Sequence, residues 1–527
     1  MFDLSLALPT ASGTGMRRRD VLDPILRNGF PYSRRLSAHN YCVNALAFSS
    51  GEGRFLASGG DDPHINLWDF HQEDVKSPFR SFVGPSGNVL SLAFSATNRF
   101  LFSGGTDKTV LKYDTTHLEA LNNAKSPSHV YCDHSDSVRS ITCHPVQDEI
   151  FMTAGEDGNV YRYDERSSSS RPRPSDTLQI PTEVTGVQYH PVMDHLFITS
   201  DARGNVCLRD ERMAFGPSTR RTNEGVVLVY NTKLTRQHVK HLSNPESSSV
   251  VFDREGNKLA VTMLHYLPTI YAVSDPNPVA VCSGKNLPNG SPVPSTERTY
   301  SNSCTMKHGS FGHPAVNTDD LYCAGSDDFR GYIWKIPPIS KLTELRTEMS
   351  ADEWEAQKSS SAVAFTTGRT MRKYVPLEIS TPFCRLNGHK SIVNTSVFHP
   401  HFLHVVTSGI EKDILLHSPT QASPCTSNLQ PTPTQVRRLT ENGDEDRHTY
   451  SRALAHSYPT NGELEDEQTT LSMFDHILRE EGESDVFTVR RWSSDSSDED
   501  EETDSDSSSY DFGARFGLVA SSSFPAF

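Results

Sequence analysis

The sequence has no long apolar run. None of its 527 residues lies in a stretch of roughly 18 to 20 consecutive apolar residues, the length that a membrane-spanning helix needs. The basic cluster Arg17–Arg19 follows the apolar N-terminal stretch, whereas a signal peptide has its basic residues first. The sequence therefore predicts an intracellular protein, in the nucleus, the cytoplasm or both, without contact to a membrane.

The sequence also lacks paired cysteines. Its nine cysteines are scattered, odd in number and include no C-x-x-C pair. These features argue against a disulfide framework and against a zinc ribbon. We expect reduced, mostly buried thiols.

Common catalytic motifs are absent as well. There is no H-E-x-x-H, no G-x-S-x-G and no Gly-rich phosphate loop with a following Lys. Three His-Pro pairs occupy one position of a repeat described below, where a turn explains them better than a metal. The pairs are His144-Pro145, His190-Pro191 and His399-Pro400. The sequence thus predicts a protein that is not an enzyme and holds no metal or cofactor.

A basic surface is missing too. The net charge is -16, and residues 420–527 carry 22 acidic and 8 basic residues, so nearly all the excess acidity lies there. The rest of the chain is close to neutral, which predicts no direct nucleic-acid binding. Residues 493–509 are only Ser, Thr, Asp and Glu, and such a run cannot bury a core. Acid-directed kinases are expected to accept its serines, although a solubilising tail explains the run equally well. The candidate serines are Ser493, Ser494, Ser496 and Ser497.

What the sequence does contain is a repeat of about 45 residues. Each copy has three strand-like runs separated by turns. The copies cover residues 43–70, 89–115, 138–165, 184–211, 248–273, 303–336 and 392–419. The aromatic position of the third strand falls at Trp68, Tyr113, Tyr163, Arg209, Tyr271, Trp334 and His417. This period is typical of a four-stranded propeller blade, and seven copies predict an all-β, seven-bladed propeller.

The ends of these repeats resemble the WD-repeat family of β-propellers. Repeats begin with Ala38-His39, Asp133-His134 and Gly388-His389, and third strands end with Trp68-Asp69, Tyr113-Asp114 and Tyr163-Asp164. The resemblance implies that residues 31–39 supply the outer strand of the last blade. It also implies a hydrogen-bond network that orders the first blade, formed by His39, Ser58, Asp62 and Trp68. Arg209, Tyr271 and His417 replace the usual Trp, which puts the network of those blades, although not the fold, in doubt.

Two consecutive third strands end in the same way. Residues 163–166 read Tyr-Asp-Glu-Arg and residues 209–212 read Arg-Asp-Glu-Arg, so Arg166 and Arg212 lie on one rim of adjacent blades. A single surface Asp–Arg pair contributes only about 0–1 kcal/mol and is weak evidence for function. Two pairs at equal register are more informative, because Arg is favoured in interfaces.

Trp-Asp-x-Arg at the end of consecutive blades resembles the docking box of WD-repeat substrate receptors of cullin-4 RING ubiquitin ligases, with Tyr163 and Arg209 in place of Trp. The resemblance covers most of residues 36–419 and extends into the tail. It implies a non-catalytic subunit that binds the triple-propeller damaged-DNA-binding adaptor, and through it the cullin-4 ligase, and presents a protein substrate whose identity the sequence does not give. The residues implied to bind the adaptor are Asp164, Arg166, Asp210 and Arg212. The alternative is a WD-repeat scaffold in another complex, such as a chromatin or RNA-processing assembly.

The chain thus divides into three parts. Residues 1–30 contain a short helix that either enters the adaptor or packs on the propeller rim. Residues 31–419 form the propeller, with insert loops around 215–247, 276–298 and 339–383. Residues 420–527 form a mostly disordered acidic tail, with a short amphipathic helix near 469–481.

Overall fold

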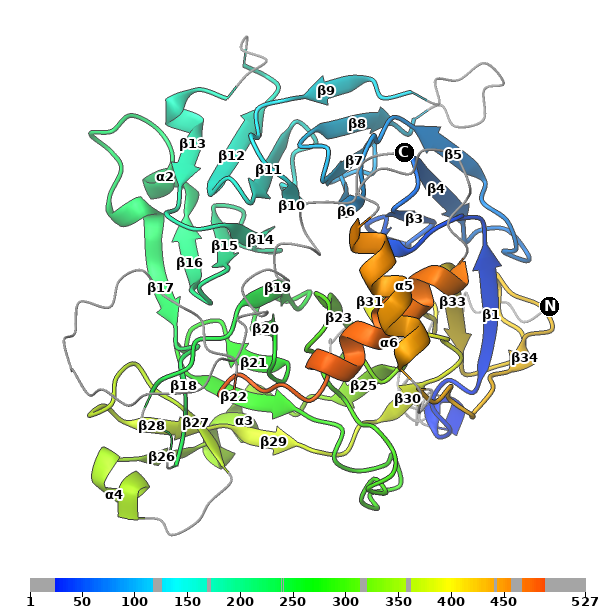
Figure 1. Ribbon diagram of the computed structural model, residues 1–527. Coiled ribbons are helices and arrows are strands. Elements are labelled where there is room, and N and C mark those ends of the chain that lie inside the picture. Colours follow the sequence, from blue (N-terminus) through cyan, green and yellow to red (C-terminus); the bar gives the residue numbers. More distant parts are fainter. Residues whose placement is uncertain are drawn as a thin grey trace, which may run out of the picture.

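The computed structural model describes residues 24–116, 126–167, 172–237, 239, 241–312, 320–356, 362–439, 443–455 and 467–488. Within these residues the strands form eight sheets. Seven of the sheets are blades whose first strands contact one another in sequence and close into a ring, from β2 through β6, β10, β14, β19, β23 and β31 back to β2 (Figure 1). The chain is therefore a β-propeller, as the repeat predicts.

Four blades follow directly along the chain. Blade 1 consists of β2 (Val43–Phe48), β3 (Phe55–Gly60), β4 (His64–Asp69) and β5 (Arg80–Val83). Blade 2 consists of β6 (Val89–Phe94), β7 (Phe100–Gly105), β8 (Val110–Asp114) and β9 (His129–Tyr131). Blade 3 consists of β10 (Val138–Cys143), β11 (Ile150–Gly155), β12 (Asn159–Asp164) and β13 (Thr177–Gln179). Blade 4 consists of β14 (Val184–Tyr189), β15 (Leu196–Asp201), β16 (Val206–Asp210) and β17 (Val226–Tyr230).

The last three blades take strands from more distant segments. Blade 5 consists of β19 (Ser247–Phe252), β20 (Lys258–Met263), β21 (Thr269–Ala272), β22 (Pro278–Cys282) and the parallel strand β29 (Leu377–Ile379). Blade 6 consists of β23 (Gly309–Gly312), β24 (Leu321–Gly325), β25 (Gly331–Lys335) and β30 (Cys384–Leu386). Blade 7 consists of β31 (Val393–Phe398), β32 (Val405–Gly409), β33 (Glu411–Ser418), β1 (Tyr32–Ser37) and β34 (Gln430–Pro431).

The aromatic position of each repeat lies in the third strand of its blade, as the sequence predicts, from Trp68 in β4 to His417 in β33. The middle strands of a blade are covered on both faces by the neighbouring blades, which explains why nearly all of their residues are buried. The second strands of blades 1 and 2 end in Gly-Gly. A Cβ on Gly60 or Gly105 would lie 1.8 Å from a backbone oxygen of the preceding connection, so only glycine fits there.

The segment before blade 1 closes the ring, as the family resemblance implies. Strand β1 pairs with β33 along its whole length, from Tyr32 opposite Ser418 to Ser37 opposite Asp413. The side chain of Leu36 is fully buried between blades, and Arg35 forms ion pairs with Glu411 and Asp413. On its other edge β1 pairs with β34 (Figure 1).

The prediction that the three inserts are loops was wrong. The first insert contains β17 and the second contains β22, the fourth strands of blades 4 and 5. The first and third together form an additional sheet of β18 (Leu234–Arg236), β27 (Val363–Phe365), β28 (Lys373–Val375) and β26 (Thr347–Met349), which we call the insert sheet. Helices α2 (Glu211–Ala214), α3 (Ile339–Leu345) and α4 (Ala351–Ala356) adjoin these strands. Most of these strands have only three to five residues, too few to show clear alternation in the sequence.

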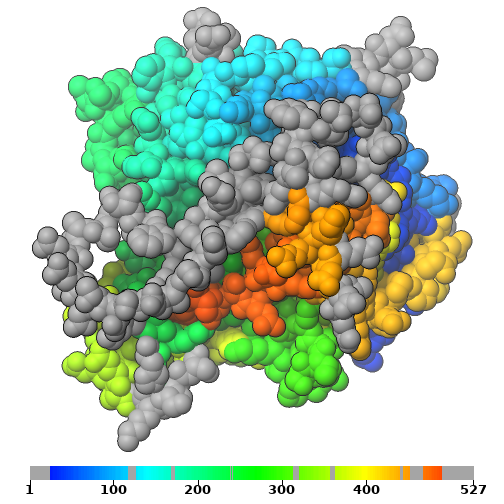
Figure 2. All heavy atoms as spheres, in the orientation of Figure 1, coloured from blue at the N-terminus to red at the C-terminus, as the bar shows by residue number. Residues whose placement is uncertain are grey.

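The prediction of a mostly disordered tail after Pro419 was too broad. Within the described residues, α5 (Asp444–Ala455) packs on α6 (Glu467–Glu481), which contains the predicted amphipathic segment. Leu471, Met473 and Leu478 of α6 are buried, and the orange and red segments lie across one face of the ring (Figure 2). The candidate phosphorylation sites Ser493 to Ser497 lie outside the described residues, as do residues 18–23 at the start of the predicted N-terminal helix. Leu26 and Phe30, in the second half of that predicted segment, are buried in the core between blades 6 and 7.

All nine cysteines are free, and Cys132 is the exposed one. Among the helices that the structure describes, none is long and apolar enough to cross a membrane.

Candidate protein-interaction site

The blade network that the sequence predicts in blade 1 has these contacts. The His39 imidazole is hydrogen-bonded through Nδ1 to Asp62 (2.9 Å) and through Nε2 to Ser58 (2.8 Å), and Trp68 Nε1–H donates to the same hydroxyl (2.9 Å). All four side chains are buried. The network joins the connection before the blade to its second and third strands, so it fixes the direction in which the third strand leaves the blade.

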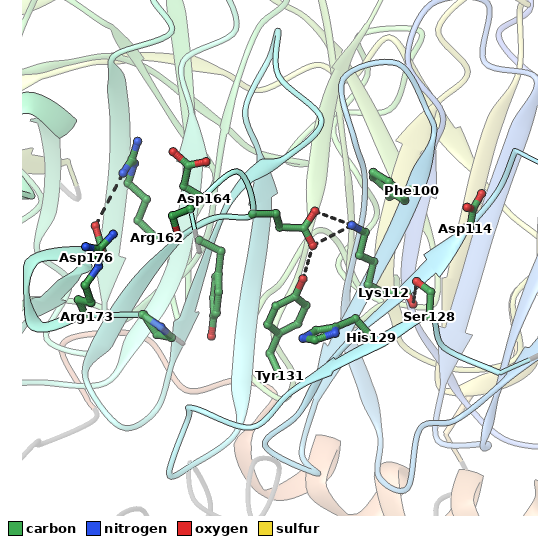
Figure 3. A pocket seen from close by; sticks show the side chains of 14 residues that line it. Phe100, Lys112, Asp114, Ser128, His129, Tyr131, Arg162, Asp164, Arg173 and Asp176 are labelled. Carbon is green, nitrogen blue, oxygen red and sulfur yellow. Dashed lines mark hydrogen bonds and ion pairs between the residues drawn. The ribbon is translucent and has the colours of Figure 1, made fainter. Parts of the chain in front are cut away.

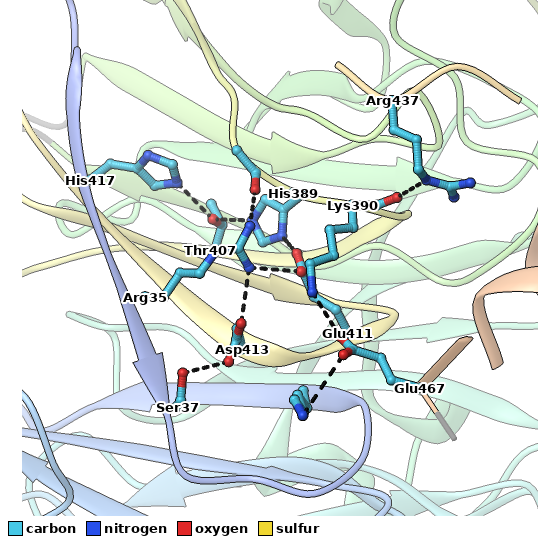
Figure 4. Close-up of polar contacts among 12 residues, drawn as sticks. Arg35, Ser37, His389, Lys390, Thr407, Glu411, Asp413, His417, Arg437 and Glu467 are labelled. Carbon is cyan, nitrogen blue, oxygen red and sulfur yellow. Dashed lines mark hydrogen bonds and ion pairs between the residues drawn. The ribbon is translucent and has the colours of Figure 1, made fainter. Parts of the chain in front are cut away.

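Blade 7 builds the same network from different residues. His389 is hydrogen-bonded to Glu411 and to Thr407 (2.6 Å), and His417 Nε2 contacts the same threonine hydroxyl at 2.9 Å (Figure 4). His417 therefore replaces Trp without breaking the network. Burial lowers the pKa of His417 to about 3, so its ring is neutral at pH 7.

Arg209 in blade 4 also occupies the Trp position. Its Nε–H donates to Thr199 at 2.9 Å, the second-strand position that Ser58 has in blade 1. The guanidinium also donates to the Glu224 carbonyl at 2.8 Å and is buried. Tyr271 of blade 5 donates instead to the Asn231 carbonyl at 2.9 Å. Arg209 replaces Trp but keeps the hydrogen bond to the second strand. The third strand of blade 4, which leads into Asp210-Glu211-Arg212, is therefore held in place.

The two Asp-Glu-Arg boxes have the same geometry. In blade 3 the Arg166 Nε and Nη2 groups donate to the two oxygens of Asp164, both at 2.8 Å. In blade 4 the Arg212 Nε and Nη2 groups donate to Asp210 at 3.0 and 2.6 Å. The hydrogen bond from the arginine lowers the pKa of each aspartate, which stays ionised. The side chains of Arg166 and Arg212 are nevertheless 53% and 67% exposed.

The pairing with the adjacent Asp therefore orients each arginine without covering it. Two of the five donors in each guanidinium fork bind the adjacent aspartate, and in Arg166 a third binds Gln147, while about half or more of each side chain stays exposed. Both arginines are thus fixed at the rim in a conformation that suits carboxylate or carbonyl oxygens of another protein.

The glutamate inside each box has a separate structural role. Glu165 reaches back to blade 2, where its oxygens lie 2.7 and 2.5 Å from the Lys112 ammonium, and Tyr131 donates its hydroxyl to the same carboxylate (Figure 3). Glu211 reaches back to blade 3, 3.4 Å from Arg162, and accepts a hydrogen bond from Tyr189 (2.8 Å). Lys112 and Arg162 both stand one residue before the aromatic position of their strands.

These inter-blade contacts tie each box to the preceding blade. They surround a pocket of about 530 Å³ between blades 2 and 3, lined by Phe100, Lys112, Tyr131, Arg162 and Asp176 among others (Figure 3). Within it Lys112 pairs with Glu165 and Arg162 pairs with Asp176, and Arg162 also contacts Glu211, so these ion pairs link blades 2, 3 and 4. The sequence analysis did not predict that these residues link the blades. Lys112 and Arg162 nevertheless occupy equivalent positions in their repeats, and so do Glu165 and Glu211.

Exposed apolar side chains lie beside the arginines. The turn between β10 and β11 presents Val146, 68% exposed, next to Gln147, whose side-chain oxygen accepts a hydrogen bond from Arg166 at 2.6 Å. The turn between β14 and β15 presents Val192 (65% exposed) and Met193. A basic and apolar mixture of this kind is typical of protein interfaces. We call Val146, Arg166, Val192, Met193 and Arg212 the arginine rim.

The histidines of the His-Pro pairs cap these turns. His144 Nδ1 accepts hydrogen bonds from the backbone N–H groups of Val146 and Gln147, at 3.1 and 3.2 Å. His190 and His399 accept the two equivalent pairs of N–H groups. Burial lowers the pKa of each ring, which keeps it neutral. The turn interpretation is confirmed, but the imidazole takes part in it. No cluster suited to a metal ion occurs within the part of the chain that the structure describes.

The opposite face of the ring is partly covered by the chain itself. Leu478 of α6 packs with Phe329 and Ile410, which lie in the turns between second and third strands of blades 6 and 7. Arg437 forms a two-pronged ion pair with Asp475 of α6, at 2.5 and 2.7 Å. Third strands run from these turns to the arginine rim, so α6 and the rim lie on opposite faces.

The ring of blades with four or five strands and its histidine networks define a WD-repeat β-propeller. The family model for the WD domain, G-beta repeat, matches residues 31–69, 76–114 and 125–164. The chain is 30% identical over 492 residues to the DDB1- and CUL4-associated factor 5 of Mus musculus and of Homo sapiens. That alignment covers 90% of this chain and 44% of each relative, so the chain spans less than half their length. Over 156 residues it is 33% identical to the WD and tetratricopeptide repeats protein 1 of Mus musculus, covering 29% of this chain and 21% of that protein. The chain is a WD-repeat protein similar to DDB1- and CUL4-associated factor 5.

Proposed function

We propose that the chain is a substrate-recognition subunit of a cullin-4 RING ubiquitin ligase that docks on the damaged-DNA-binding adaptor through the arginine rim. The observation that carries this proposal is the equal presentation of Arg166 and Arg212 by adjacent blades, each held by its own aspartate beside exposed apolar residues. Similarity to relatives named for association with DDB1 and CUL4 supports the choice of partner.

The rim suits a protein partner in two ways. Each orienting aspartate reduces the rotamer freedom that its arginine loses on binding, which lowers the entropy cost of association. Val146, Val192 and Met193 offer apolar area that a partner can bury, with the arginines at its edge. Because Glu165 and Glu211 hold blades 2 to 4 together, the two arginines meet the adaptor as one rigid unit.

In this function the chain carries out no chemistry of its own. It holds a protein substrate near the ubiquitin-loaded enzyme of the ligase, and the rate increase comes from proximity supplied by the assembly. The arginine rim takes the adaptor, which leaves the opposite face and the insert sheet for the substrate.

The test is co-purification of the adaptor with the full chain carrying Arg166→Glu and Arg212→Glu together. We expect adaptor binding to fall at least about 100-fold, because charge reversal at two interface arginines removes about 3 kcal/mol or more. The matched control is Arg54→Glu. Arg54 is also an exposed arginine bound to the aspartate that ends a third strand, Asp69, but it lies in blade 1. Unchanged adaptor recovery by a folded double variant would refute the docking, and recovery of a different assembly by wild type would favour a scaffold function instead.

A further inference from the structure

The residues that follow α6 occupy a defined site on the face opposite the arginine rim. After Gly482 the chain runs from the ring of blades toward the insert sheet (the red end of the ribbon in Figure 1). Val486 and Phe487 are only 7% and 9% exposed, and they belong to the same buried cluster as Leu234 and Phe365 of the insert sheet. Although it lies beside an acidic tail, the segment that contains Val486 and Phe487 is therefore bound to the insert sheet and blade 5.

The backbone of this segment is held by the turn between β20 and β21. The carbonyl of Ser484 accepts hydrogen bonds from Ser303 Oγ (3.2 Å) and from His265 Nδ1 (3.3 Å), and the N–H of Val486 donates to the His265 carbonyl at 3.2 Å. His265 has a φ of 59°, in the left-handed region, which turns both its side chain and its carbonyl toward the segment. Residues Asp485–Thr488 form a turn, in which the N–H of Thr488 donates to the Asp485 carbonyl at 3.0 Å, so recognition of this kind accepts peptides that adopt the same turn.

Specificity comes from Arg236 of β18. Its guanidinium lies 2.9 Å from the Asp485 carboxylate and 4.4 Å from the centre of the Phe487 ring. One arginine therefore binds the acidic residue as an ion pair and the aromatic residue by a cation–π contact. Tyr266 and Val363 pack against the cluster that receives the two apolar side chains. Together the contacts fit an acidic residue, then an apolar residue, then an aromatic one.

The site does not depend on this segment for its own structure. Strand β18 pairs with β27, and the turn that carries His265 connects two strands of blade 5. Helix α6 is anchored separately by Asp475 and Leu478, so Ser484–Phe487 can leave the site while α6 stays in place. Only a few residues join the two, which gives the segment an effective concentration in the millimolar range.

We propose that the groove formed by Arg236, His265, Ser303 and the insert sheet is a docking site for short peptides with the pattern acidic–apolar–aromatic, and that Asp485–Phe487 occupies it in cis. The partner is a protein that carries this pattern in a segment able to form the same turn. As a substrate site the groove rests on the proposed function, whereas peptide binding itself is measured without the adaptor.

The first experiment uses a fluorescent peptide with the sequence of residues 481–488 and the full chain with Val486→Ser and Phe487→Ser, which empties the groove. We expect this opened chain to bind the peptide at least tenfold more tightly than wild type does. Adding Arg236→Glu to the opened chain should abolish binding, and peptides with Asp→Asn or Phe→Ala changes should bind at least tenfold more weakly. An opened chain that binds the peptide no better than wild type, or no better than a scrambled peptide, would overturn the proposal.

A second experiment needs no variant and decides the question if the opened chain fails to fold. Hydrogen exchange of wild-type chain is followed with and without excess peptide. We expect residues 482–488 to lose protection when the peptide displaces them, while β20 and β21 keep theirs. Unchanged protection at saturating peptide would show that the segment is a permanent part of the core. Because the groove and the arginine rim lie on opposite faces, adaptor recovery by the opened chain separates failure of this proposal from failure of the proposed function.

Discussion

The ion pair between Lys112 and Glu165 should be strongly coupled, because it is nearly removed from water. The two side chains are only 10% and 23% exposed, and the ammonium also lies 3.5 Å from the centre of the Phe100 ring. At charge separations near 3 Å, and with an effective dielectric constant of about 20, the attraction is about 5 kcal/mol before desolvation is subtracted. Changing Glu165 to Gln leaves a nearly buried ammonium with a neutral partner.

The expected losses in the free energy of unfolding differ between the two single variants, because the ammonium left by Glu165→Gln is more buried than the carboxylate left by Lys112→Met. Breaking a fully buried pair costs about 3–5 kcal/mol, and the partial exposure of Glu165 reduces that to about 2 kcal/mol for Glu165→Gln. Lys112→Met should cost about 1 kcal/mol, because Tyr131 still donates to the carboxylate. The double variant should cost only about 1 kcal/mol, since no unpaired charge remains, which gives a coupling energy of about 2 kcal/mol.

The measurement is a double-mutant cycle by urea unfolding, with midpoints compared at unchanged slope. The control cycle uses Lys108→Met and Asp136→Asn, an exposed pair on blades 2 and 3 whose side chains are 51% and 48% accessible and 3.7 Å apart. That pair should couple by less than about 0.5 kcal/mol. A coupling equally small for Lys112 and Glu165 would refute the view that the box glutamates hold the blades together.

Three further predictions concern the ring. Trp68→Phe should lower the free energy of unfolding by about 1–2 kcal/mol, because Ser58 loses a buried hydrogen-bond donor; urea unfolding measures this, and no change would exclude the network as a source of stability. Leu36→Ala should cost about 3 kcal/mol and raise hydrogen exchange in β33, since the side chain is fully buried in the closing strand; unaltered exchange there would contradict the closure. Burial lowers the pKa of His404 to about 4, so the unfolded chain takes up its proton first and stability falls as pH drops from about 6.5 toward 4, by about 1.4 kcal/mol at pH 5.5. His404→Gln should remove that part of the pH dependence, and identical pH profiles would refute it.

The architecture was accessible from the sequence because each blade repeats local rules. The aromatic position, the His-Pro turn and the Gly-Gly end recur at fixed spacing, and each reflects a contact within one blade or with its neighbour. Even the substitutions at Arg209 and His417 keep a nitrogen that is hydrogen-bonded to the second-strand hydroxyl. A repeat therefore predicts the fold wherever a position keeps its hydrogen bond, even if the residue type at that position changes.

The remaining features depend on contacts between distant segments. Arg236 meets Asp485 only because the insert sheet and the segment after α6 converge on blade 5. Nothing in the spacing of either residue indicates this pairing, and short outer strands such as β17 carry too few residues to be distinguished from loops. The positions of Arg166 and Arg212 were predictable from the strand direction, whereas the inter-blade role of Glu165 required the neighbouring blade to be seen.

The closing strand also sets an order of events during synthesis. Strand β1 precedes blade 1 in the chain, so it is made before its partners β33 and β34, which follow all the other blades. Until then Arg35 and Leu36 have no partner strand, and the nascent chain carries an unpaired edge of the kind that other chains can bind. The ring is thus closed only when β33, which ends at Ser418, has been made, so a chain truncated before β33 should aggregate although six of its blades are complete.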